Sequence, residues 1–173
     1  MSIPIVIEYV WNEENFIRGN GYYLRSLVRT PIRILFYIFS SLIFILACIA
    51  IYRKGIQISS GFLFLVGAYL LFLRHFEYKY FARRRFKKRP DKNKRIRIEV
   101  TEDIIKSEVE DIGKSEANWN SVYKALRNKE GIIIYPNEGI YNWIPNHAFQ
   151  NEEELNQFWD LVKRKVQLCK EAF

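Results

Sequence analysis

Two long stretches without a charged side chain lie close together in the first half of the chain and restrict its fold more than any other feature. The first, ILFYIFSSLIFILACIAIY, covers residues 34–52, and the second, IQISSGFLFLVGAYLLFL, covers residues 56–73. A helix rises about 1.5 Å per residue, so 19 residues nearly cross a hydrocarbon core of about 30 Å. Buried helices of a soluble protein are the alternative, but two such runs joined by one tight turn favour a membrane. We therefore expect a transmembrane hairpin over residues 30–76, with helices at about 32–52 and 57–75.

Basic residues near the ends of the hairpin predict its orientation. Twelve Lys and Arg side chains flank the open end of the hairpin, whereas the connecting turn carries only Arg53 and Lys54. Cytoplasmic flanks of transmembrane helices are enriched in Lys and Arg. We therefore expect a multi-pass protein of the cytoplasmic (inner) membrane, with both termini in the cytoplasm.

A strongly basic stretch, FEYKYFARRRFKKRPDKNKR, follows the second apolar run, and we call its residues 77–94 the basic collar. Residues 74–97 carry 12 Lys/Arg against 2 acids, whereas residues 98–173 carry 9 against 14. Each basic residue beside a cytoplasmic leaflet gains about 1 kcal/mol from anionic lipid. The alternative interpretation is that these charges only set the orientation of the hairpin in the membrane. Nucleic acid is not expected, because the adjoining domain is acidic and has no recognition motif. The candidate contacts with anionic lipid at the membrane surface are Arg74, Lys79, Arg83, Arg84, Arg85, Lys87, Lys88 and Arg89.

Residues 1–29 predict a cytoplasmic strand followed by an amphipathic helix. The segment IPIVIEYVW alternates apolar residues with a period of two, which is typical of a half-buried strand. Asn12 followed by Glu13 and Glu14 is a helix-start pattern, and a sparse apolar stripe follows it.

Residues 95–173 predict a small cytoplasmic domain of strands closed by a helix. Six short segments of strand character lie between residues 95 and 145, which indicates an antiparallel barrel or sandwich. The last segment, NEEELNQFWDLVKRKVQLCKEAF, has one apolar face and predicts a helix over residues 152–171 that caps the barrel. The expected fold class is therefore an α+β membrane protein, a two-helix hairpin joined to this domain.

A pattern of mostly apolar residues runs through residues 117–163 and consists of Trp119, Val122, Ile132 to Ile134, Ile144, Pro145 and Phe149. By this pattern the stretch resembles the C-terminal domain of the YcxB-like family of bacterial membrane proteins. The resemblance also covers the layout of the whole chain, a short N-terminal segment, two membrane helices and this domain. It implies a bacterial protein with a pleckstrin-homology-like barrel, and it brings no catalytic residues.

No pattern in the sequence points to catalysis or to a cofactor. The chain has no glycine-rich phosphate loop, no nucleophile elbow and no HExxH zinc motif. His75 and His147 are isolated, and Cys48 and Cys169 lie too far apart in sequence to suggest a metal site. We expect no enzyme, no cofactor and no bound metal.

Two functional hypotheses from different classes follow from these features. In the first, the hairpin tethers a cytoplasmic interaction module that binds an unknown protein or anionic lipid, with an oligomer as an option. In the second, hairpins assemble into a small transport or pore protein, although neither apolar run carries the mid-membrane charge that usually marks an ion route. A membrane immunity protein is a narrower form of the first hypothesis.

Overall fold

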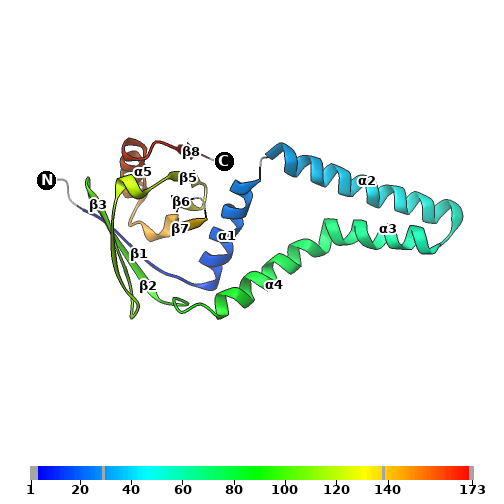
Figure 1. Ribbon diagram of the computed structural model, residues 1–173, viewed down its shortest axis with the longest axis horizontal. Helices are drawn as coiled ribbons and strands as arrows, with labels where there is room; N and C mark the ends of the chain where they lie inside the picture. Colours follow the sequence, from blue (N-terminus) through cyan, green and yellow to red (C-terminus); the bar gives the residue numbers. More distant parts are fainter. Residues whose placement is uncertain (1–3, 29, 138, 172–173) are drawn as a thin grey trace. The chain divides into compact units, whose positions relative to one another are not determined.

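The computed structural model describes residues 4–28, 30–137 and 139–171, apart from the side chains of Arg74 and His75 (Figure 1). The chain divides into two compact units. Unit 1 consists of residues 1–23 together with 86–173, and unit 2 consists of residues 24–85. Unit 2 is therefore an insertion within the sequence of unit 1. Helices and sheets occur together in the structure, which confirms the expected α+β class.

Sheet A contains four antiparallel strands in chain order, and it joins the two sequence segments of unit 1. Ile7 lies opposite Ile98 in the pairing of the first two strands, and both side chains are buried. The alternation of apolar and polar residues thus places one face of the sheet in the core. The strands are β1 (Ile5–Val10), β2 (Arg95–Val100), β3 (Ile104–Val109) and β4 (Gly113–Asn118).

Sheet B has the strand order β7-β6-β5-β8. The sequence predicted only antiparallel strands, whereas sheet B is mixed. Its antiparallel part comprises β5 (Lys124–Asn128), β6 (Gly131–Asn137) and β7 (Ile140–Pro145). The short β8 (Cys169–Glu171) pairs with β5 in parallel, and the Ala125 N–H donates to the Leu168 carbonyl at 2.9 Å. The pair is parallel because the last helix carries the chain back before β8 begins.

The C-terminal helix α5 (Glu152–Lys165) supplies much of the core of unit 1. Its first turn is capped by the Asn151 side chain, which accepts a hydrogen bond from the Glu154 N–H. The helix ends six residues before the expected position 171, because Val166 adopts an extended backbone that leads into β8. Its buried residues are Leu155, Phe158, Trp159, Leu161 and Val162.

Helix α1 (Glu13–Leu27) packs on Trp143 of β7 through a glycine. A Cβ at Gly19 would lie 2.7 Å from Trp143 Cγ, so only glycine permits this approach without a shift. The Tyr22 ring stacks on Trp143 with ring centroids 5.5 Å apart. The Tyr9 hydroxyl donates to the Trp143 carbonyl at 2.8 Å, and burial raises the pKa of this phenol. Trp143 thus links α1, β1 and sheet B.

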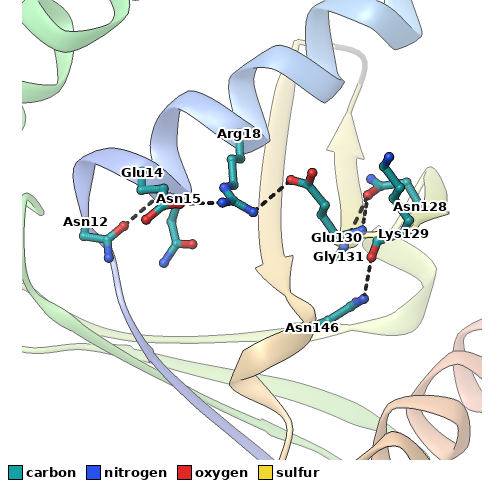
Figure 2. Close-up of polar contacts among 9 residues, drawn as sticks. All are labelled: Asn12, Glu14, Asn15, Arg18, Asn128, Lys129, Glu130, Gly131 and Asn146. Atoms are coloured by element: carbon teal, nitrogen blue, oxygen red, sulfur yellow. Dashed lines mark hydrogen bonds and ion pairs between the residues drawn. The ribbon is translucent and has the colours of Figure 1, made fainter.

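Polar contacts hold the first half of α1 to the turn between β5 and β6 (Figure 2). The Arg18 guanidinium pairs with Glu14 at 2.5 Å and with Glu130 of the turn at 3.2 Å. Asn128 shapes the turn, because its side-chain oxygen accepts from the N–H groups of Glu130 and Gly131. The ion pairs are solvent-exposed and contribute little energy, so the packing on Trp143 is the stronger link.

Unit 2 is helical and contains α2 (Thr30–Lys54), α3 (Ile58–Ala68), a π-helical turn η1 (Tyr69–Leu73) and most of α4 (Arg74–Lys87). Helix α2 is long and apolar enough to cross a membrane. The segments Ile58–Leu73 and Phe76–Lys87 meet the same criterion only together, as a bent pair. The described residues thus contain one candidate span, or two if the bent pair is one span, which gives weak support for a membrane association.

Helices α2 and α3 run side by side (Figure 1) and pack through small residues. Ser40 and Ala47 of α2 are fully buried, and a Cβ at Gly67 would lie 2.9 Å from the Phe44 Cα. Small residues allow close approach of helices where the surrounding medium is apolar. Large apolar side chains cover the opposite side of α2, as expected for contact with lipid. The exposed residues of this kind in α2 include Leu35, Ile38, Phe39, Leu42, Ile45, Leu46 and Ile49.

The contact between Gly19 and Trp143 predicts a large cost for a single methyl group. Gly19→Ala should lower the free energy of unfolding of unit 1 by about 1–3 kcal/mol, because overpacking outweighs the gain in helix propensity. Gly61→Ala is the matched control, since a Cβ at this helical glycine meets no atom within 4 Å. Denaturant unfolding followed by tryptophan fluorescence measures both variants. Equal stability of the two variants would contradict the proposed packing.

Candidate membrane-contact surface

The exposed side of α4 changes from aromatic to basic along the chain. Phe76, Tyr80 and Arg84 follow one another at intervals of four, and Lys88 continues the row just after the helix ends. Residues four apart share one helix face. The Phe76 and Tyr80 side chains are 69% and 62% exposed. Aromatic rings favour the membrane–water interface and basic residues favour the head groups beyond it, so this order suits a helix that leaves a membrane.

The buried stripe of the helix consists of small and aromatic residues. Ala82 and Phe86, again four apart, are each 3% exposed. Phe86 belongs to unit 1, where its ring lies 5.5 Å from that of Phe16 in α1. The end of α4 is therefore anchored in the core of unit 1, and its charged residues remain at the surface.

Arg89 differs from the other residues of the basic collar because it is fixed to unit 1. Its guanidinium donates two hydrogen bonds to the Asp91 carboxylate, at 2.6 and 2.8 Å. Its Cζ also lies 5.6 Å from the centroid of the Phe16 ring, in a cation–π contact. The hydrogen bonds from Arg89 lower the pKa of Asp91, and the same bonds raise the pKa of Arg89. Arg89 thus holds the segment after α4 against Phe16 of α1.

The turn after Arg89 fastens the end of the basic collar to the end of β1. Asn93 takes a left-handed backbone with φ 59°, and its N–H donates to the Trp11 carbonyl at 2.8 Å. The Trp11 N–H in turn donates to the Lys94 carbonyl at 2.9 Å. The Lys94 ammonium pairs with Asp111 at 2.5 Å. These bonds continue the β1–β2 pairing into the collar, so its last residues have a defined position in unit 1.

Most of the remaining basic residues of the surface present their charge to solvent. Arg83 has further interactions, and the Arg74 side chain lies outside the described part of the chain. Glu77 is the acid of α4, and its carboxylate accepts from the Tyr69 hydroxyl. A set of basic side chains is exposed and forms no ion pair or side-chain hydrogen bond within the described residues. This set, the exposed cation set, is Lys79, Arg84, Arg85, Lys87 and Lys88.

A cleft of unit 1 has a lining of mixed charge. It measures about 670 Å³ and lies between the β5–β6 turn and the start of α5. Arg127 and Lys129 contribute positive charge to it, and Glu152 and Glu171 contribute negative charge. This balance selects no class of ligand.

The isolated histidine and cysteine of unit 1 lie in separate local structures. His147 lies in the short 3-10 turn η3 (Asn146–Ala148), and the Cys169 thiol donates to the carbonyls of Val162 and Val166. Burial raises the pKa of this thiol. Within residues 4–28, 30–137 and 139–171, no three His, Cys, Asp or Glu side chains lie close enough together to hold a metal ion.

An α+β protein with two four-stranded sheets, a C-terminal helix and an inserted apolar helical segment is the class that these observations define. Residues 100–162, about a third of the chain, match the family model described as YcxB-like protein, so this part of the chain is similar to that family. The match begins at the end of β2 and extends into α5. It confirms the resemblance noted in the sequence. Comparison with curated proteins and with solved structures gives no match.

Sequence reasoning found the basic residues of this surface but not the division among them. Eight candidate contacts were expected, and the structure separates Arg89, which binds Asp91, from the exposed cation set. The signal available in the sequence was the acid two residues after Arg89. The regular spacing of Phe76, Tyr80 and Arg84 was also available, but it becomes meaningful only once the segment is known to be helical.

The lowered pKa of Asp91 predicts how the contribution of Arg89 depends on pH. A carboxylate with a depressed folded-state pKa adds stability above its ordinary value near 4, and loses this stability as the pH falls through the folded value. Arg89→Gln should therefore lower stability at pH 7 by roughly 1 kcal/mol. The difference in stability between Arg89→Gln and the wild type should disappear at low pH, where Asp91 is protonated. Thermal unfolding between pH 2 and 7 measures it, with Lys88→Gln as the control. A constant difference at all pH values would contradict the pairing.

Proposed function

We propose that the protein is a membrane-anchored interaction module, in which residues 30–76 form a transmembrane hairpin and the exposed cation set binds anionic lipid at the cytoplasmic face. The observation that carries this proposal is the row of exposed rings and basic residues along α4, directly after an apolar segment. Positive charges near an anionic leaflet gain about 1 kcal/mol each. The exposed cation set has no ion-pair partner within the part of the chain that the structure describes, so its charges can make that contact.

The pairing of β1 with β2 supports a hairpin rather than a single crossing. These strands flank residues 24–85 in sequence and lie in one sheet. A chain that left the cytoplasm through α2 must therefore return before β2, and the number of crossings is even. The return path is the segment Ile58–Leu73, whose 16 residues cover about 24 Å. The first turns of α4, with their interfacial rings, supply the remaining length.

The packing inside unit 2 favours a tether over a pore. Ser40, Ala47 and Gly67 are occupied by the contact between α2 and α3. The Ser40 hydroxyl donates to the Phe36 carbonyl within its own helix at 2.8 Å. These small residues therefore serve packing within one hairpin, and they offer no polar path between hairpins.

The arrangement of unit 1 supports the expected pleckstrin-homology-like barrel. Four strands of sheet A precede three antiparallel strands of sheet B, and α5 follows them. The Tyr9 hydroxyl bonds β1, at one edge of sheet A, to β7, at one edge of sheet B. The Trp119 indole donates to the Thr101 carbonyl at 3.0 Å, next to the end of β2. These contacts between the two sheets support a closed core of the kind found in a small binding domain.

Removing cations from the exposed set should weaken lipid binding without unfolding unit 1. Arg84→Gln/Lys87→Gln/Lys88→Gln should lower the affinity for phosphatidylglycerol at low salt by at least about tenfold, because each charge contributes up to about 1 kcal/mol. Added salt should reduce the difference. Native mass spectrometry of the full chain in detergent measures bound lipid. The control Lys106→Gln/Lys129→Gln/Lys170→Gln removes equal charge from exposed positions of unit 1. Equal loss in both variants would contradict a specific contact.

The hairpin predicts opposite accessibility for its turn and for the basic collar. In a Cys48→Ala/Cys169→Ala background, Gly55→Cys should react with a membrane-impermeant maleimide applied to intact cells. Gly55 has φ 72° and directly follows α2 at the start of the connecting turn, where an added Cβ meets no atom within 4 Å. Lys92→Cys should react only after the cells are lysed. Labelling of Lys92→Cys from outside would overturn the orientation or the return crossing, and labelling of neither in intact cells would overturn the hairpin itself.

A further inference from the structure

Strand β4 forms the free edge of sheet A. It pairs with β3 on one side, and all six of its residues are exposed. An exposed strand edge presents unpaired backbone N–H and C=O groups that another strand can bind. Within the described residues, no strand covers this edge.

The hydrogen-bond alternation of sheet A identifies which residues of β4 face outward. The Glu110 N–H donates to the Arg95 carbonyl and the Thr101 N–H to the Ile104 carbonyl, each at 3.0 Å. Backbone groups of successive residues point to opposite sides of a strand. The even-numbered residues of β3 therefore face β2, and its odd-numbered residues face β4. Through the β3–β4 register, the outward-facing residues of β4 are Lys114, Glu116 and Asn118.

Alternating charges cover the solvent face of sheet A and reach this edge. Lys114 pairs with Glu108 at 3.0 Å, and Arg97 pairs with Glu8 at 3.2 Å. One cross-strand row is Glu8, Arg97, Glu108 and Lys114, and the next contains Glu99, Lys106 and Glu116. The two rows therefore end at the edge with charges of opposite sign, two residues apart.

These two charges distinguish between the ways in which a second β4 strand can add in antiparallel orientation. Outward-facing residues must meet outward-facing residues, so Lys114 lies opposite Lys114, opposite Glu116 or opposite Asn118 of the second copy. The first arrangement opposes like charges, and the third places Glu116 opposite Glu116. Only the second arrangement, with Lys114 opposite Glu116, gives attractive pairs. It gives two such pairs, because the two-fold axis also places Glu116 opposite Lys114 of the second copy. Like charges directly opposite one another are destabilising.

We propose that two copies of the chain associate through β4, with Ser115 opposite Ser115 of the second copy, so that sheet A continues across a two-fold axis. In this arrangement the backbone groups of Lys114 and Glu116 form hydrogen bonds with the second copy, and their side chains form the charged pairs. The Asn118 carbonyl already accepts from the Ser121 hydroxyl at 2.7 Å, which limits the pairing to the middle of the strand.

The side chains of β4 favour a second copy over an unrelated strand. Its inner face carries only Gly113, Ser115 and Ala117, so the pairing offers no deep pocket for the side chains of a foreign peptide. Lysine on an edge strand also opposes indiscriminate pairing. A partner must therefore supply an acid and a base with the same spacing, which the chain itself does. A shared membrane would raise the effective concentration of two copies. The inference concerns β4 and holds whether or not the collar binds lipid.

Charge exchange at the edge tests the proposal. Lys114→Glu and Glu116→Lys should each weaken association of the full chain by on the order of tenfold, because both pairs become repulsive. The double variant Lys114→Glu/Glu116→Lys should restore it. An equimolar mixture of the two single variants should form heterodimers, which also shows that both are folded. Analytical ultracentrifugation in detergent measures association. A monomer at all concentrations, or a dimer that these changes do not affect, would overturn the proposal.

A cysteine at the two-fold axis tests the register directly. In the Cys48→Ala/Cys169→Ala background, Ser115→Cys should form an intermolecular disulfide on mild oxidation, since facing residues in such a pair lie within disulfide range. Lys114→Cys is the matched control, because the two equivalent positions lie on a diagonal about 7–8 Å apart. Cross-linking that is no greater for Ser115→Cys than for Lys114→Cys would rule out this register. The same result is expected if a different protein, and not a second copy, occupies the edge.

Discussion

The antiparallel pairing of β1 with β2 is the interaction on which the rest of the structure depends. It joins the N-terminal segment to the chain that follows the basic collar, and so both ends of the apolar insertion belong to one sheet. The backbone bonds continue beyond the strands, through Trp11 to Asn93 and Lys94. Without this pairing, the two sequence segments of unit 1 would not share sheet A. With it, a chain that entered a membrane through α2 would have to return to the same side before β2.

Aromatic packing stabilises the two connections that this pairing brings together. On the N-terminal side, Gly19 lets α1 approach Trp143, and the ring of Tyr22 stacks on the same indole. On the other side, Phe86 packs on Phe16, and Arg89 lies over the same Phe16 ring. Each connection is thus anchored by apolar contacts in unit 1, which leaves the charged residues of α4 at the surface.

The charges of the protein are arranged in two different ways, and each suits a different kind of contact. The exposed cation set has a single sign and no partner within the described residues, so its field extends toward any anionic surface within a Debye length. The face of sheet A alternates in sign, and most of its field cancels beyond its nearest neighbours. Such a face cannot attract a distant partner, but at the edge it discriminates between registers. The first arrangement supports attachment to a surface, and the second supports selective pairing.

The apolar runs, the basic collar, the α+β class and the family resemblance were all readable from the sequence, because each depends on composition or on periodicity over a few neighbouring residues. The sequence alone also placed the start of α5 at residue 152. Only the tertiary structure decided that β1 joins β2, that the last residues form β8, and that Arg89 binds Asp91 while its basic neighbours stay exposed. These outcomes depend on which distant segments meet, and a local pattern contains no information about its partner. The outward side of β4 belongs to the same group, since it follows from the register of three strands.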